Sequence, residues 1–193
     1  MRLTERVHHD LKQHIHLGDA VIDATAGNGH DTLFLAQTVG KKGHVFTFDI
    51  QAQALKNTRQ RVEKHLNTAP VEYIHNGHEQ MQAKLPLDYH GHIQAIVFNL
   101  GYLPQAAHTM ITTPQTTLNA LQQACALLGQ GGIISILAYT GHDGGREEAE
   151  AIKQWLFTLN ENFEYHIEIP QNTRLSPPEY IFIHKISSEV IHT

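Results

Sequence analysis

The stretch Val21-Ile-Asp-Ala-Thr-Ala-Gly-Asn-Gly-His-Asp-Thr32 decides the fold. It has the pattern of a short apolar strand that runs into a glycine-rich turn and then into a helix. Gly27 and Gly29 carry no Cβ, so the backbone can turn tightly there and come close to a ligand. Thr32 stands where a dinucleotide fingerprint has a third small residue. Because Asp23 adds a carboxylate at the strand end, the stretch predicts a site for a cationic ligand.

The rest of the chain alternates between apolar β-branched runs and segments with helical spacing, as in a parallel sheet with helices on both faces. The last two runs are joined by a short polar loop with no room for a crossover helix, so they should pair antiparallel. The whole chain, residues 1–193, is therefore expected to form a single α/β domain with a seven-stranded, mostly parallel sheet and a C-terminal antiparallel hairpin. The predicted strands are Ala20–Ala24, His44–Asp49, Val71–Ile74, Ile93–Asn99, Gly132–Ala138, Glu164–Ile169 and Tyr180–His184. The predicted helices are Thr4–Ile15, Thr32–Val39, Ala52–Leu66, Gln115–Leu128 and Arg146–Leu159.

Composition excludes several classes of protein. A formal net charge of −5 argues against coating nucleic acid by bulk electrostatics, although a local basic patch is compatible with it. No apolar run is long enough for a signal peptide or a membrane span, so a cytoplasmic protein is expected. Cys125 is the one cysteine, which rules out a disulfide framework. The sixteen histidines lack zinc-motif spacing, so they are interpreted as scattered surface residues, and no metal site is expected.

Two further strand ends carry candidate cofactor residues. Asp49 closes the second predicted strand, where a carboxylate can accept two hydrogen bonds from a ribose diol. The same position also suits an N-cap for the helix that follows. After the third strand, Gly77 permits a turn, and His78 or Glu79 is either a contact for an adenine edge or a cap for the next short helix.

The fourth predicted strand ends in a candidate acceptor site. Asn99-Leu-Gly-Tyr102 lies at the carboxyl end of this strand, the edge of a parallel sheet where ligands bind. Asn99 offers an amide oxygen that can accept a hydrogen bond from an amine, and Tyr102 offers a flat face for a base. A polar loop with a buried tyrosine is the alternative interpretation.

These motifs together resemble the class I methyltransferases, which use S-adenosylmethionine on a Rossmann-like fold. Asp23-Ala-Thr-Ala-Gly-Asn-Gly29 is similar to their first motif, and Asp49 is similar to their ribose-binding acid. Asn99-Leu-Gly-Tyr102 resembles the Asn-Pro-Pro-Tyr motif of amine-methylating members, with Leu100-Gly101 in place of the two prolines. The resemblance extends over essentially the whole chain, closing hairpin included, and implies S-adenosylmethionine as the cofactor.

A narrower resemblance is to a small bacterial family labelled rRNA methylases. It rests on the first motif together with Phe48-Asp-Ile-Gln51, Asn76-Gly-His-Glu79, Asn99-Leu-Gly-Tyr-Leu-Pro104 and Tyr139-Thr-Gly-His-Asp-Gly-Gly145. The resemblance implies methylation of the aminomethyl group of 5-aminomethyl-2-thiouridine at the tRNA wobble position, and thus an anticodon region as partner. Carried over by motif, the cofactor would be surrounded by Asn28, Asp31, Thr32, Asp49, Gln51, His78 and Glu79, with Asn99 and Tyr102 at the acceptor.

The loop after the fifth strand and the loop before the seventh supply candidate substrate residues. His142 is a candidate proton acceptor, although a solvated turn explains it equally well. Arg146, Asn172 and Arg174 are candidate phosphate or nucleotide contacts, and Arg2, Lys12, Lys41 and Lys42 could extend a basic edge. The apolar face of the first predicted helix could cover the sheet or meet a second subunit in a homodimer.

Rival functions stay open at this point. A nicotinamide-dependent oxidoreductase shares the glycine turn and the acid after the second strand, but the closing hairpin and the Asn99 motif count against it. A non-catalytic protein that kept the cofactor fold is a second alternative. Among methyltransferases, rRNA, free nucleosides, small amines and protein side chains are alternative acceptors.

Overall fold

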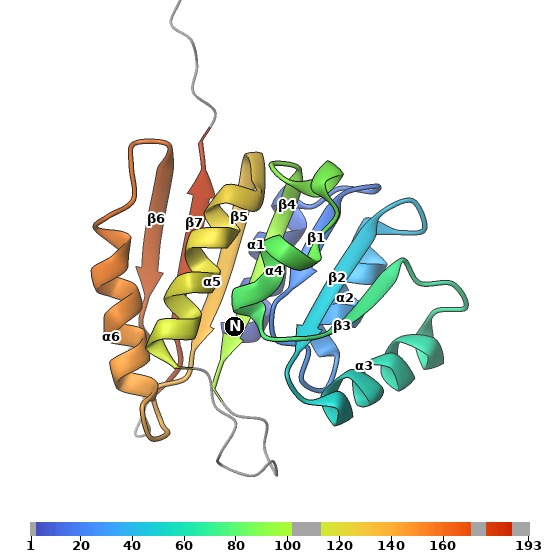
Figure 1. Cartoon of the computed structure of the whole chain (residues 1–193), viewed down its shortest axis with the longest axis horizontal. Coiled ribbons are helices and arrows are strands. Elements are labelled where there is room, and N and C mark those ends of the chain that lie inside the picture. The colour runs from blue at the N-terminus through green and yellow to red at the C-terminus, as the bar shows by residue number, and fades with distance from the viewer. Residues whose placement is uncertain (1–2, 102–112, 171–176, 187–193) are drawn as a thin grey trace, which may run out of the picture.

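The structure is a computed structural model that describes residues 3–101, 113–170 and 177–186. Its strands form a seven-stranded sheet in the order β3-β2-β1-β4-β5-β7-β6 (Figure 1). The strands are β1 (Ala20–Asp23), β2 (His44–Asp49), β3 (Val71–His75), β4 (Ile93–Leu100), β5 (Leu128–Ala138), β6 (Phe163–Glu168) and β7 (Glu179–Lys185). The helices are α1 (Leu3–His14), α2 (His30–Val39), α3 (Ala52–His65), α4 (Met81–Lys84), α5 (Pro114–Leu127) and α6 (Gly145–Leu156), with short 3-10 turns at His78–Gln80 and Leu87–Tyr89.

The pairing of the strands confirms the predicted Rossmann-like sheet. β1 pairs in parallel with β2 and β4, and the parallel ladder continues to β3 on one side and β5 on the other. β7 is antiparallel to β6, as the short connection between the last two strands predicts, and it is also antiparallel to β5. The carboxyl ends of the parallel strands therefore share one edge, the lower edge in Figure 1, where β4 and β5 end side by side.

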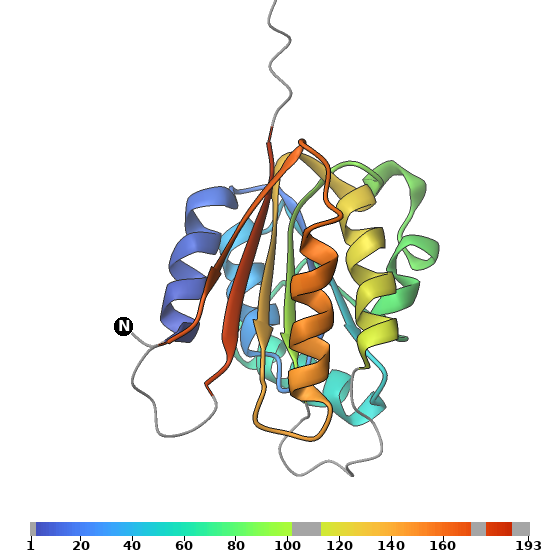
Figure 2. The ribbon, with the colours of Figure 1, turned by 90° about the vertical axis from the view of Figure 1, so that its left-hand side faces the viewer.

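Helices cover both faces of the sheet, as the alternation predicts. Figure 2 shows α1 on one side and α5 and α6 on the other. On the α1 side, Leu11 and Leu35 pack with Val21 and Val45 of the sheet. On the opposite side, Leu121 and Ile152 pack with strand residues in the larger of the two core clusters. Burying apolar side chains on both faces holds the strand ends in fixed positions, and these ends carry the site.

The start of β5 differs from the prediction. The expected helix through Leu128 ends at Leu127, and the strand begins at Leu128 instead of Gly132. The reason is a close approach to β4, where the pairing shifts register between Ile93 and Ala95. A Cβ on Gly132 would lie 2.9 Å from the carbonyl oxygen of Ile93, so a glycine at this bulge lets the two backbones meet.

The structure also describes the single cysteine and the lengths of the helices. Cys125 is partly buried, and this burial raises the pKa of its thiol to about 12, which is consistent with an inert side chain. Within the described ranges, no helix is both long and apolar enough to cross a membrane.

Candidate active site

The glycine-rich turn between β1 and α2 has the backbone conformation that its sequence predicts. Gly27 and Gly29 both have positive φ, 54° and 77°. Gly29 is also the N-cap of α2, and a Cβ there would lie 2.6 Å from the Cα of Thr58 on α3. The absent side chain thus lets α2 and α3 pack closely.

Asp49 at the end of β2 is hydrogen-bonded to the turn. The Gly27 N–H donates to Asp49 Oδ2 at 3.0 Å, and the Gln51 N–H donates to Oδ1 at 2.8 Å. Asp49 is half-buried, and each of its oxygens retains capacity to accept another hydrogen bond. The carboxylate is held at the tip of the strand in the place expected of a group that binds a diol. Gln51 contacts Asp49 through its backbone N–H and is the N-cap residue of α3.

Asp23 is positioned differently from the sequence expectation. Its side chain does not face an open site: it is fully buried, accepting from Thr32 Oγ1 at 2.5 Å and from the Thr25 N–H at 3.1 Å. Burial, with the charge of Asp31 adding to it, raises the pKa of Asp23 to about 7. Thr32, also buried, continues the network to Thr47 Oγ1 at 3.0 Å. Asp23 and Thr32 therefore brace the turn from beneath.

Asn28 is exposed at the top of the turn and is held by α3. Arg61 Nε donates to the Asn28 carbonyl oxygen at 2.6 Å, and Asn57 Nδ2 lies 3.4 Å from Asn28 Oδ1. The guanidinium of Arg61 was not singled out by the sequence analysis. Because it fixes a backbone carbonyl of the turn, it stabilises the turn's conformation.

His78 and Glu79 follow β3 and lie next to the turn. His78 is buried, and its Nδ1 donates to the Ala24 carbonyl oxygen at 3.2 Å. Burial lowers the pKa of His78, so the ring is neutral near pH 7. The backbone carbonyl of Glu79 accepts from Gln123 Nε2, which ties this segment to α5. His78 thus supports the end of β1, while the half-buried Glu79 keeps an ionisable side chain beside Gly77.

Asn99 on β4 is fixed at both its backbone and its side chain. Its N–H donates to Thr25 Oγ1 at 2.7 Å, and its Nδ2 donates to Asp31 Oδ2 at 2.6 Å. Asp31 is in turn bonded through Oδ1 to Nε2 of His8, at 2.6 Å. The candidate acceptor residue is therefore joined directly to the glycine turn and to the start of α2.

The loop after β5 lies against the end of β4. The Tyr139 N–H donates to the Leu100 carbonyl at 3.0 Å, and a Cβ on Gly101 would lie 3.3 Å from Tyr139 Cβ and 3.6 Å from His142 Nε2. His142 Nδ1 lies 3.0 Å from the Asp143 carbonyl oxygen, which can only accept, so Nδ1 carries the hydrogen of this bond and Nε2 is the ring nitrogen that can act as an acceptor. Glycine at position 101 leaves room for the side chains of Tyr139 and His142. The amine-methylating enzymes whose motif this stretch resembles have a proline at the corresponding position.

An open cavity of about 510 Å³ runs along this loop, lined by residues from Thr140 to Glu147 that include His142 and Arg146. Arg146 is exposed in the first turn of α6. Tyr102, Asn172 and Arg174 lie outside the described residues, as does Arg2. The structure thus brings His142 and Arg146 to the same edge as Asn99, through β5 and α6.

Sequence reasoning missed three residues of this network. His8 was counted among the scattered surface histidines, yet it is half-buried and bonded to Asp31. Thr25 was quoted only as part of the turn, and its hydroxyl anchors Asn99. Tyr139 was quoted only as the start of a loop, and the charge of Asp31 adds to the burial that raises the pKa of its phenol. A single sequence gives no signal for His8, because its partner is 23 residues away on another helix.

Comparison with known proteins identifies the family. Residues 45–185 match the family described as "Putative rRNA methylase". The chain belongs to this family. The match covers most of the chain and includes Asp49, Asn99 and His142, while the glycine turn precedes it. The predicted resemblance is confirmed, and membership in a methyltransferase family leaves the oxidoreductase alternative without support.

Solved structures with the same fold agree with this assignment. An rRNA methylase structure from Clostridium thermocellum is 38% identical, with a TM-score of 0.89, and the alignment covers 95% of this chain and 97% of that one. A methyltransferase from Streptococcus mutans, solved in complex with SAH (S-adenosylhomocysteine), is 35% identical with a TM-score of 0.85, and the coverage is 96% and 99%. The predicted cofactor, S-adenosylmethionine, and the predicted class I methyltransferase fold are confirmed.

A curated relative carries a more specific name. The chain is 38% identical over 160 residues to the chloroplastic tRNA (mnm(5)s(2)U34)-methyltransferase of Arabidopsis thaliana. This match covers 79% of the chain and 58% of the relative, so the chain spans a little over half of that protein's length.

Proposed function

We propose that this protein transfers a methyl group from S-adenosylmethionine to an RNA amine, the aminomethyl group of 5-aminomethyl-2-thiouridine at the tRNA wobble position. The observation that carries the proposal is the fixed amide of Asn99 at the carboxyl end of β4, beside the glycine turn. An amide oxygen held at this edge can accept from an N–H of an amine and aim the nitrogen lone pair.

The turn and the end of β2 fit the cofactor. Asp49 is an acceptor with spare lone pairs, suited to the two hydroxyls of a ribose. Gly27 has no Cβ to cover the backbone of the turn, which suits close approach of a ligand, whereas the missing side chain of Gly29 makes room for Thr58 of α3. Asp31 and Asp49 make this edge acidic, which favours a cationic sulfonium and ammonium over a phosphate. Asn28, Gln51 and Glu79 complete the proposed cofactor site, and the buried side chains of Thr32 and His78 support it from within the fold.

The reaction places simple demands on the chain. S-adenosylmethionine supplies, when bound, a methyl group on a positively charged sulfur. Transfer would require a neutral acceptor nitrogen, whose lone pair would form the new bond to the methyl carbon as the carbon–sulfur bond breaks and leaves its electrons on sulfur. Asn99 Oδ1 orients that nitrogen, and His142, whose Nε2 is an acceptor beside Gly101, takes the proton that the ammonium form has to lose. Tyr139, next to Gly101, offers an aromatic face to the nucleobase, and Tyr102 is proposed for the same part of the site.

The tRNA substrate is supported by the name of the Arabidopsis relative, at 38% identity. Arg146 at the loop cavity, together with Asn172 and Arg174, is proposed to contact phosphate or nucleotide groups of the anticodon region. A cytoplasmic location, a single domain and a homodimer remain predictions from the sequence. The family description favours rRNA as a second candidate substrate.

A substrate panel tests the proposal. The native protein is incubated with labelled S-adenosylmethionine and, separately, tRNA from cells that leave the aminomethyl wobble uridine unmethylated, ribosomal subunits, and a free small amine. Label in the wobble nucleoside of the tRNA is the expected result. Label only in rRNA would replace the tRNA assignment with the second candidate, and cofactor binding with no transfer to any acceptor would favour a non-catalytic protein.

A further inference from the structure

A chain of three polar side chains links the N-terminal helix to the acceptor amide. His8 Nε2 on α1 lies 2.6 Å from Asp31 Oδ1 on α2, and Asp31 Oδ2 lies 2.6 Å from Asn99 Nδ2 on β4. Each oxygen of one carboxylate therefore has a different partner. Asp31 is half-buried, so water competes with these bonds less than it would at an exposed carboxylate.

This arrangement decides which end of the Asn99 amide faces the substrate. A carboxylate accepts hydrogen bonds and has none to donate, so it selects the NH₂ end of the amide and leaves Oδ1 turned away from Asp31. The backbone of Asn99 is fixed independently by Thr25. We propose that Asp31 and His8 are positioning residues that hold the Asn99 amide with its oxygen toward the acceptor amine.

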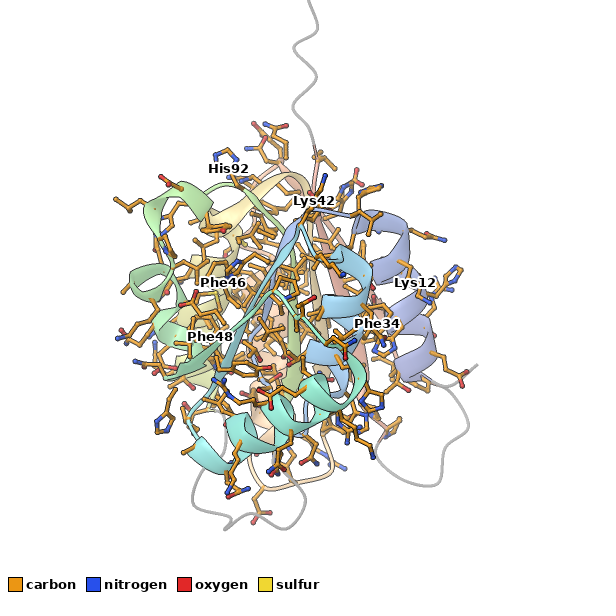
Figure 3. The ribbon with its side chains drawn as sticks, turned by 90° about the vertical axis from the view of Figure 1, so that its right-hand side faces the viewer. Lys12, Phe34, Lys42, Phe46, Phe48 and His92 are labelled. Carbon is orange, nitrogen blue, oxygen red and sulfur yellow. The ribbon has the colours of Figure 1, made fainter. Side chains whose placement is uncertain are left out.

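His8 is well placed to hold Asp31. Its ring stacks on Phe34 with centroids 3.9 Å apart and the planes within 4°. The neighbouring Val7 and Leu11 are buried in the core, which anchors this part of α1 to the sheet. Figure 3 shows Phe34 on α2 with Lys12 of α1 near it, and Lys12 Nζ lies 5.7 Å from the ring centroid. The imidazole is therefore oriented by packing, and its N–H is a directed donor to Asp31.

Asp31 and helix α1 have different roles in this arrangement from those expected. Asp31, expected among the cofactor residues, acts through Asn99, and α1, which precedes the first strand, becomes part of the acceptor site. Without His8, Asp31 would lose the bond at Oδ1 and could rotate, and the Asn99 amide would then be free to turn. The inference rests on the proposed function only for the identity of the substrate, because the amide orientation is a property of the free protein.

Variants at His8 test the series of hydrogen bonds from His8 through Asp31 to Asn99. His8→Leu removes the donor and keeps an apolar side chain against Phe34, whereas His8→Gln keeps an N–H that can reach the carboxylate. His9→Leu is the matched control, since His9 is exposed on the same helix and bonds Gln13. With RNA substrate and saturating cofactor, His8→Leu should lower kcat about tenfold or more, with the Kd for S-adenosylhomocysteine within about twofold of native. His8→Gln should recover most of that loss, and His9→Leu should change neither quantity.

A second readout needs no turnover. In ¹H–¹⁵N spectra of the free protein, the side-chain Nδ2H₂ signals of Asn99, assigned by their loss in Asn99→Ala, should shift or broaden in His8→Leu and stay unchanged in His9→Leu. Unchanged Asn99 signals in His8→Leu, or a Kd that weakens in parallel with kcat, would overturn the positioning role. If the native protein methylates no RNA while the Asn99 signals respond to His8→Leu, the proposed substrate is wrong and the positioning chain stands.

Discussion

The backbone N–H of Gly27 donates to Oδ2 of Asp49 across 3.0 Å, which joins the glycine turn after β1 to the tip of β2. Two motifs separated by 22 residues in the chain are thus one structural unit. The carboxylate holds the turn and still has lone pairs for a ligand, so the turn and its diol-binding group are positioned relative to each other before any cofactor arrives.

Replacing Asp49 should weaken cofactor binding. Asp49→Asn keeps the size of the side chain but removes its charge and one acceptor, so one contact among Gly27, Gln51 and the ribose hydroxyls must be lost. Hydrogen bonds to a charged group contribute about 1.5–3 kcal/mol, so the Kd for S-adenosylmethionine should rise by about tenfold or more. Calorimetry checks this, with the exposed Asp88→Asn as control. An unchanged Kd would mean that Asp49 serves only the turn.

Gly29 should be intolerant of a side chain because of its neighbour on α3 as well as its backbone. Gly29→Ala adds a Cβ 2.6 Å from Thr58 Cα at a φ of +77°. Gly91→Ala is a matched control, because Gly91 has a φ of +75° and nothing within 4 Å of the added Cβ. Both variants should lose about 1–2 kcal/mol of unfolding free energy from the left-handed backbone, and Gly29→Ala about 1–3 kcal/mol more from the overlap. Equal losses in urea titrations would show that α2 and α3 can separate at little cost.

Asp23 should make the stability of the free protein depend on pH. Its folded pKa of about 7 lies above the ordinary value of 3.8, so the native state binds the proton more tightly than the unfolded state does. The stabilisation is fully present below pH 4 and is lost as pH rises toward about 7, by at most about 4 kcal/mol.

The variant that isolates this effect is Asp23→Asn, which has no carboxyl group to titrate. The change in unfolding free energy between pH 5 and pH 8 should be more negative for the native protein than for Asp23→Asn, measured by urea denaturation without cofactor. Comparing slopes with pH cancels the contributions of the other titrating groups and any constant loss of stability in the variant. Identical slopes would show that Asp23 is already ionised at pH 5.

Much of the fold could be predicted because the residue types in the strands indicate that they are buried in a sheet. Val21, Val45 and Val97 are apolar and β-branched in runs bounded by turns, and all three are buried in the sheet. Glycine and acid at strand ends similarly predicted where the site lies. The start of β5 escaped prediction because Gly129 and Gly132, typical of a turn, serve here to let two strands approach.

The connections within the site could be predicted only in part. Asp49 and Asn99 were found because each ends a strand at the edge where ligands bind. The orientation of Asp23 was predicted wrongly because a carboxylate at a strand end can point either to solvent or under the turn. Its hydrogen bond with Thr32 holds it under the turn. His8 was missed because its bond to Asp31 depends on how α1 docks on the sheet, which no local pattern in the sequence records.

The most direct test of the account is methyl transfer by the native protein and Asn99→Ala to tRNA that carries 5-aminomethyl-2-thiouridine at the wobble position. Native protein should label the wobble nucleoside, and the variant should transfer methyl about a hundredfold more slowly with its Kd for S-adenosylhomocysteine unchanged. Transfer by Asn99→Ala at the native rate would contradict the proposed acceptor site.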